Sequence, residues 1–354
     1  MPIIDFTSTF TDEQVRSLSE LLFLDYVEAG NFSDFHDVHT GIISGKEIAW
    51  IGEMPDIGRT SRGCNPTYDI AEIPTIKKTW NPKEFDARLK ECYKDLEDTM
   101  AVYARNTGTR VADLTNTDYF KIISERFGRA IERMVWRTWI MDLDHTLVGA
   151  GAGTQQITAG QDITLVNILD GYWKQIAAIV SANASQQTVV AANSAATKAE
   201  QFSDLTPALA LGYLMDATYN MPVELVQRND KVGIITRYFA NQVKRQFQAT
   251  NTHPEAYQAV KDGVEVLMVN GVDFAIIDEW TKQIETYHDL GATFLLPHRA
   301  LITTRDNLAY GITSEGTFNT LEMWYEKLDR HSYIDLIDQV DVKVMQDDLI
   351  QVIY

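Results

Sequence analysis

The stretch from residue 40 to residue 80 constrains this chain most, because it reads as a long hairpin with no core of its own. Residues 42–51 and 70–80 are extended in character and apolar only in short patches. Between them, Gly52 to Pro66 holds three glycines, two prolines and two arginines, which is a typical loop composition. A two-stranded ribbon of this kind is stable only against a neighbouring surface, often that of another subunit. A disordered surface loop is the alternative.

Long helical patterns lie on both sides of the hairpin. One is expected before it, from about Thr11 to Val27. After it, Asn81 as N-cap and an apolar stripe from Phe85 to Tyr103 predict a second helix. A third helix is predicted over 117–141, with apolar residues on one side and arginines on the other. At 1.5 Å per residue it would be roughly 37 Å long, which suits a spine through a thin body.

The second half of the chain alternates between helical and extended patterns, after a boundary rich in small residues at 149–165. Asn270-Gly271 predicts a tight hairpin turn within 263–278. Val340, Val342 and Val344 alternate with charged residues, as in a half-buried strand, and the chain ends on a further strand that must pair with a sheet to be ordered. The other predicted elements are helices at 166–181, 205–219 and 238–248 and strands at 232–237, 294–304 and 349–354. These patterns predict an α+β fold with a compact α/β middle.

Charge and cysteine content narrow the function classes. Asp and Glu number 50 against 31 Lys and Arg, giving a formal net charge of -19. A protein that grips nucleic acid by neutralising phosphates needs clustered basic residues, so this class is disfavoured, although a container around DNA is not. Cys64 and Cys92 predict reduced thiols in a protein made in the cytosol. Neither a signal peptide nor a membrane-spanning run is read in the sequence.

Two stretches carry a resemblance to a known family. The first runs from Trp80-Asn81-Pro82 to Asp95-Leu96-Glu97, with Trp139-Ile140-Met141-Asp142 after the spine. The second runs from Leu301 to Thr313 and is followed by Met323-Trp324-Tyr325. Together with the element order, they resemble the tailed-bacteriophage major capsid family, which has the Hong-Kong-97-like fold, and are similar to capsid proteins of Bacteroidetes phages and prophages. The family has Gly-Thr where this chain has Gly311-Ile312-Thr313, a small departure.

The resemblance implies a division of the chain and a function. The implied segments are an N-terminal arm (1–35), an extended hairpin loop (36–80), a peripheral domain with the spine helix (81–160), an α/β axial domain (161–310) and a return to the peripheral domain (311–354). The implied function is a virion shell of hexamers and pentamers, assembled in the host cytoplasm around double-stranded DNA without sequence-specific binding. Scaffolding and portal proteins are the implied partners, with no membrane, cofactor, metal or enzyme activity. Lys46 stands where some members crosslink, but without a matching motif it reads as an ordinary surface lysine.

One motif matches an enzyme family and gives an alternative hypothesis. Asp142-Leu143-Asp144-His145-Thr146 matches the DxDxT pattern of magnesium-dependent haloacid-dehalogenase-like phosphatases. There Asp142 would attack phosphorus and Asp144 would act as general acid or base. This chemistry needs a buried, continuously apolar strand just before the motif, and Arg137 and Thr138 interrupt that segment. The end of a helix running into a loop is therefore the favoured interpretation.

The remaining polar and aromatic clusters predict structural roles. Asp34, His36, Asp37 and His39 could ligate a metal, but a solvated turn is the favoured interpretation. Asp347-Asp348 reads as a turn. Trp136, Trp139, Trp324 and Tyr325 read as core or interface anchors.

An encapsulin-like cellular container, which would hold a cargo protein in place of DNA, is a third hypothesis.

Overall fold

The computed structural model describes residues 32–51, 75–92, 128–147, 156–250, 259–261, 264–313, 320–326 and 331–354. The predicted helix at 11–27, the hairpin residues 52–74 and the first part of the predicted spine lie outside these ranges. Within them, no helix is both long enough and apolar enough to cross a membrane.

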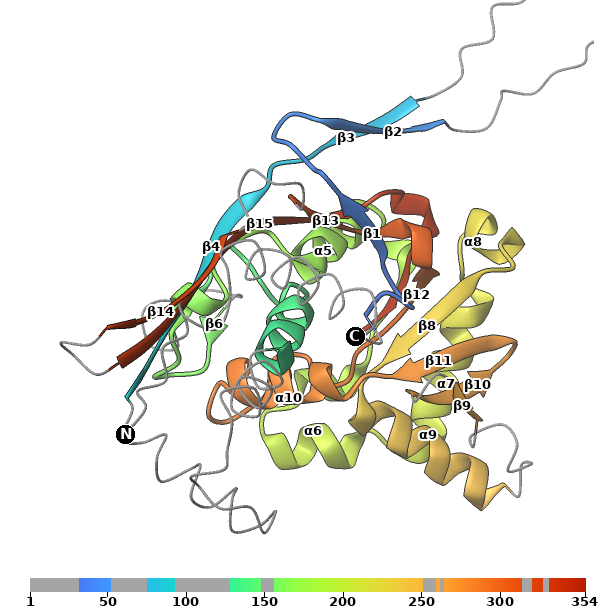
Figure 1. Cartoon of the computed structure of the whole chain (residues 1–354). Helices are drawn as coiled ribbons and strands as arrows, with labels where there is room; N and C mark the ends of the chain where they lie inside the picture. Colours follow the sequence, from blue (N-terminus) through green and yellow to red (C-terminus); the bar gives the residue numbers. More distant parts are fainter. Residues whose placement is uncertain are drawn as a thin grey trace, which may run out of the picture.

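A five-stranded sheet is organised around one long strand, β15 (His331–Val344). β13 (Leu308–Ile312) and β14 (Thr320–Glu326) run antiparallel to its two halves, and β1 (Asp37–Thr40) lies parallel to β13. β4 (Lys83–Cys92) pairs antiparallel with residues 331–340 of β15. Strands from both ends of the chain therefore meet in one curved layer (Figure 1).

The helix predicted from Asn81 onward is wrong over its described part, which is the strand β4. The same residues carry a second pattern, because charged residues alternate with the apolar Phe85, Ala87 and Leu89. Phe85 is buried while Asp86 and Arg88 are exposed, which is the period of two of a strand with one face on the core. Ten backbone partners along β15 decide between the two periods, since tertiary pairing overrides local propensity.

A seven-stranded sheet forms the second layer, and its order is β7-β16-β12-β8-β11-β10-β9. The predicted hairpin turn is confirmed: Asn270 and Gly271 both have positive φ, 49° and 78°, between β10 and β11. The terminal strand β16 pairs with β12 and β7, so the predicted pinning of the C-terminus is confirmed. The strands of this sheet are β7 (Gln187–Thr188), β8 (Lys231–Ile235), β9 (Ala259–Lys261), β10 (Val264–Val269), β11 (Val272–Ile276), β12 (Ala300–Thr304) and β16 (Gln351–Ile353).

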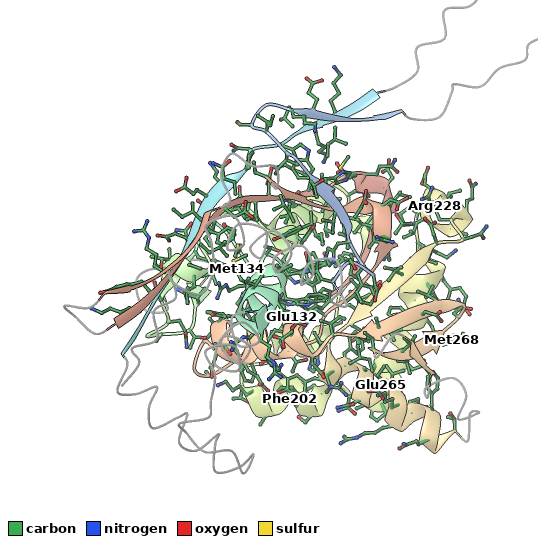
Figure 2. The ribbon with its side chains drawn as sticks, viewed as in Figure 1. Glu132, Met134, Phe202, Arg228, Glu265 and Met268 are labelled. Carbon is green, nitrogen blue, oxygen red and sulfur yellow. The ribbon has the colours of Figure 1, made fainter. Side chains whose placement is uncertain are left out.

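Helices cover this second sheet and fill the space between the two layers. Thr206 caps α7, accepting a hydrogen bond from the Leu209 backbone, and Pro207 occupies the first helical position. Glu265 on β10 (labelled in Figure 2) pairs with Arg237 and Lys244 of α9, which fixes that helix to the sheet. The helices are 128–137, α5 (Tyr172–Ala182), α6 (Lys198–Asp204), α7 (Pro207–Tyr219), α8 (Val223–Gln227), α9 (Arg237–Ala249) and α10 (Asp278–Tyr287), and two short strands, β5 (Thr146–Leu147) and β6 (Gln156–Ile157), pair in parallel.

One hydrophobic core joins the two sheets. Helix 128–137 contributes Met134 (labelled in Figure 2) and Trp136, and α5 contributes Tyr172. The Trp139 ring packs 4.7 Å from Tyr172 and 4.6 Å from Trp280, both within the range of favourable aromatic pairs. Trp136 and Trp139 are therefore core anchors, as predicted. The described part of the predicted spine is confirmed as helix over 128–137, but residues 138–141, predicted as its end, form a turn and a loop.

Gln175 of α5 covers the part of β15 that lies beyond β4. Its side-chain amide donates to the Val342 carbonyl at 2.8 Å and accepts from the Val344 backbone amide at 3.0 Å. A side chain here replaces the missing neighbouring strand, so that the sheet edge keeps its hydrogen bonds.

Removing this edge cover is expected to destabilise the subunit. Gln175→Ala leaves a buried donor and acceptor of β15 unpaired, so we expect the free energy of unfolding to fall by about 1–3 kcal/mol. Urea denaturation measures the change. The matched control is Gln227→Ala at the exposed end of α8, which should change the value by less than about 0.5 kcal/mol. Equal effects of the two substitutions would contradict the role given to Gln175.

Candidate functional site

The most distinctive surface is a two-stranded ribbon that leaves the body of the protein. β2 (Glu47–Ile51) pairs antiparallel with β3 (Thr75–Thr79), and Figure 1 shows the pair lying beyond the five-stranded sheet. The Lys77 ammonium and the Glu47 carboxylate pair at 2.9 Å on its exposed surface. The base of the predicted hairpin is thus confirmed, although residues 42–46 lie before the first strand, with a turn at Ser44-Gly45.

The ribbon is held at its base by a small apolar cluster. Trp80, Ile42, Ala309 and Met345 are all buried there, two from the hairpin and two from the body. Backbone hydrogen bonds continue the ladder from Trp80 N to the Lys46 carbonyl at 3.0 Å. The Lys46 side chain is exposed and donates to the Gly41 carbonyl at 3.3 Å, consistent with an ordinary surface lysine.

Gly311 on β13 makes this close packing possible. A Cβ atom at this position would lie 2.8 Å from Ile42 Cδ1 and 2.8 Å from Trp80 Cζ3, well inside normal contact. The ribbon base therefore rests on a strand position that only glycine fits without rearrangement.

Gly311→Ala is expected to lower the free energy of unfolding by about 1–3 kcal/mol, because overpacking forces Trp80 or Ile42 out of place. Gly212→Ala in α7 is the matched control. No atom lies within 4 Å of a Cβ there, and alanine favours helix, so it should stabilise by up to about 1 kcal/mol. Thermal unfolding of both variants measures the difference. A Gly311→Ala protein as stable as the parent would show that the contact is loose.

The phosphatase motif does not form a phosphatase site. Asp142 and Asp144 follow helix 128–137 and the turn 138–140, where the chemistry would require the end of a buried strand. Lys174 of α5 binds both, at 2.7 Å to Asp142 Oδ1 and 2.6 Å to Asp144 Oδ2, and a third carboxylate, Asp170, at 2.8 Å. Burial of the ammonium opposes its charge, but the three carboxylates outweigh this and raise the pKa of Lys174. The favoured interpretation, a helix end running into a loop, is confirmed.

The residues considered as metal ligands are separated by burial. His36 is fully buried, with Nδ1–H donating to the Phe32 carbonyl at 2.8 Å and Nε2 accepting from Trp139 Nε1 at 3.0 Å. Its ring stacks on Phe32 with 3.6 Å between centroids, so the predicted solvated turn is wrong for this residue. His39 instead pairs with Asp37 near the surface, at 3.0 Å. Within the described residues, no three His, Cys, Asp or Glu side chains group as metal ligands.

The other predicted residues have structural positions as well. Asp347 and Asp348 begin a short 3₁₀ turn, as the prediction of a turn required, and Asp347 pairs with Lys78 of the ribbon at 3.1 Å. Trp324 and Tyr325 lie in β14, but their side chains fall outside the described part of the chain, as does that of Cys92.

Solved structures match this fold over most of the chain. The satellite phage P4 procapsid, solved with its size-determination (Sid) protein, matches with a TM-score of 0.56 at 10% identity, over 95% of this chain and 98% of that one. This chain has the Hong-Kong-97-like capsid fold. A structure of Gordonia phage Cozz matches the capsid fold here with a TM-score of 0.50 at 13% identity, over 90% of this chain and 84% of that one. No protein-family model and no curated protein matches the chain.

Within the capsid fold, several important residues went unrecognised in the sequence. Nothing local marks Gln175 as the cover of a sheet edge or Lys174 as the partner of three aspartates. Arg299 gave a usable signal: it stands directly before the apolar strand β12, and a charged residue beside a fully buried strand is unusual. Gly311 gave a weaker one, as a glycine inside a strand pattern.

Proposed function

We propose that this chain is the major capsid protein of a tailed bacteriophage and that its copies assemble into an icosahedral shell. The observation that carries the proposal is the match to the P4 procapsid chain over nearly the whole length of both chains. The exposed ribbon supports it independently. A two-stranded ribbon without its own core buries its apolar patches only against another molecule, and a shell supplies that molecule as a second copy.

In the proposed shell, each segment has a distinct task. Residues 1–35 form the N-terminal arm and 36–80 the segment of the extended loop, of which β1 stays in the five-stranded sheet and the ribbon beyond Lys46 lies over a neighbouring subunit. Residues 81–160 and 311–354 form the peripheral domain, and 161–310 form the axial domain that meets its copies at the centre of a hexamer or pentamer. The two domains exchange strands, because β16 joins the seven-stranded sheet and β13 the five-stranded one. A separate scaffolding protein and a portal complete the particle, and within the fold the chain is most similar in kind to the capsid proteins of Bacteroidetes phages and prophages.

The charge of the chain suits a wall around double-stranded DNA that does not adhere to its contents. A net charge of -19 repels phosphate and limits non-specific binding, while it keeps the free subunits soluble before assembly. We therefore infer that the shell retains DNA by enclosure and not by sequence-specific contacts.

The outward side of α7 is the surface in the axial domain best suited to contact a second copy. Leu209, Met215 and Tyr219 are exposed on it, and Asp216 is the single charged residue in this helix. Val223, at the start of α8 shortly after Tyr219 in the chain, is also apolar and is 65% exposed. The chain is strongly acidic, so two copies repel each other least where a face carries a single charge. Burial of the apolar side chains on this face would also stabilise the contact.

Charge placed on this face is expected to block assembly without unfolding the subunit. Leu209→Glu leaves the buried side of α7 intact but puts an unpaired carboxylate into the proposed contact, so the protein concentration needed for assembly should rise at least about tenfold. Sedimentation velocity of concentrated protein, with and without a co-expressed scaffold, measures it. Leu209→Met, which keeps the surface apolar, should assemble like the parent. Assembly of Leu209→Glu at the same protein concentration as the parent would show that the contact between copies does not involve this face.

A further inference from the structure

A small cavity lies where α5, the loop before β12 and the last residue of the chain meet. Its volume is about 210 Å³, far more than the roughly 15 Å³ that one water needs. Its wall combines apolar side chains with polar ones, among them Trp173, His288, Arg299 and Tyr354. None of these residues takes part in the ribbon or in the α7 face.

Arg299 is held in this wall by one edge of its guanidinium group. Nε donates to the Leu296 carbonyl at 2.7 Å, and Nη2 donates to the Leu295 carbonyl at 2.7 Å and to His288 Nδ1 at 3.0 Å. Leu296 has a φ of 46°, a left-handed backbone that is costly for leucine and that marks sites where the surroundings impose a geometry. This fixed loop uses three of the five donors and leaves Nη1 without a partner among the described residues.

The charge of Arg299 is not neutralised by a carboxylate. The residue is 4% exposed, and it forms no ion pair with any acidic side chain in the described part of the chain. Asp142 has the single side-chain carboxylate among the described residues lining the cavity, and it is bound to Lys174. The Trp173 ring lies 5.3 Å from the guanidinium and offsets part of the missing charge. Burial lowers the pKa of Arg299 to about 9, which leaves it charged at neutral pH.

Buried charges in proteins are normally paired, and removing one partner of such a pair is costly. We propose that the cavity binds an oxyanion, a carboxylate or phosphate group, through the free Nη1 edge of Arg299. The group could belong to a small molecule or to an acidic side chain of a second copy, since the chain carries 50 aspartates and glutamates. Oxyanion binding by the free subunit does not depend on the proposed shell, whereas a carboxylate from a second copy rests on it.

Titration of the purified subunit with acetate, against chloride at the same ionic strength, tests the site. We expect the melting temperature to rise with acetate and to saturate, with a dissociation constant on the order of 1 mM for so small a ligand. Arg299→Gln should abolish the acetate-specific rise. The matched control Arg228→Lys, whose guanidinium pairs with Asp230 at the surface, should keep it. An acetate effect equal to that of chloride, or one that survives in Arg299→Gln, would overturn the proposal.

Arg299→Gln also removes hydrogen bonds to the loop, so it could fail to fold. Nuclear magnetic resonance of ¹⁵N-labelled arginine side chains in the parent protein then decides. One buried guanidinium should shift saturably with acetate, and the absence of any saturable shift would overturn the proposal. Repeating the titration on assembled material separates the two sources of the oxyanion. Retained acetate binding indicates a small ligand, whereas its loss on assembly indicates a carboxylate from a neighbouring copy.

Discussion

Replacing residues 47–79 by an Asn-Gly turn is expected to give a subunit that folds but no longer assembles. Trp80 N bonds to the Lys46 carbonyl, so these residues face each other across an antiparallel pair. A two-residue turn closes such a pair with the natural twist. The apolar cluster around Trp80 stays in place, which is why the body should keep its fold. What the variant loses is the ribbon that we propose lies over a neighbour.

Two measurements separate folding from assembly in this variant. Circular dichroism and urea unfolding should match the parent within about 1 kcal/mol, while sedimentation should show no particles even at a tenfold higher concentration. The matched control carries Glu47→Gln and Lys77→Gln, which remove a surface ion pair worth little but keep the ribbon, and it should assemble. Normal shells from the shortened protein would refute the role of the ribbon.

Acidification is expected to destabilise the subunit through His36. Burial lowers the pKa of this imidazole from 6.5 to about 3, and the hydrogen bond to the Phe32 carbonyl offsets only part of the effect. The unfolded chain therefore takes up a proton at His36 below pH 6.5 that the folded protein does not. The contribution of neutral, buried His36 to the free energy of unfolding is fully present above pH 6.5. It is lost as the pH falls toward 3, at about 1.4 kcal/mol per pH unit.

Between pH 6.5 and pH 5 this group alone should remove about 2 kcal/mol from the free energy of unfolding. His298, whose pKa burial lowers to about 4, and His288, whose pKa burial also lowers, act in the same direction. His36→Gln should flatten the pH dependence by about 2 kcal/mol in this window, because a neutral amide can still bond to Phe32 and Trp139. Gln227→Ala, at an exposed residue that does not titrate, is the control and should leave the slope unchanged. Urea unfolding at half-unit pH steps measures the pH dependence of the free energy of unfolding. Parallel curves for His36→Gln and the parent would show that His36 is not the cause of the acid destabilisation.

The elements that could be predicted are those whose pattern has only one interpretation. The Asn270-Gly271 turn, the helix α9 and the terminal strand β16 follow from local chemistry and periodicity, and the structure contains all three. β4 could not be predicted, because its residues satisfy both a helical stripe and a strand alternation. The partner that decides between them, β15, lies some 250 residues later in the chain, and its pairing is invisible to local patterns.

Site residues were harder to predict for the same reason. His36 was read beside its sequence neighbours Asp37 and His39, but its real partners are Phe32 and the distant Trp139. The residue types and spacing of the Asp142 motif match a phosphatase. The structure instead places a helix before the motif and binds Asp142 to the ammonium of Lys174, so its role is structural. Residue type and spacing limit which chemistry is available, and only the assembled core determines which groups face one another.

Negative-stain electron microscopy of the purified, concentrated protein, alone and with a co-expressed scaffold, shows whether the chain assembles into a shell. We expect rings of five or six subunits, tubes or round shells in at least one of these conditions. Nucleic acid or a cargo protein inside closed particles would then distinguish a phage shell from a cellular container. A uniformly small, monodisperse particle under every condition would contradict the claim that this chain builds a capsid.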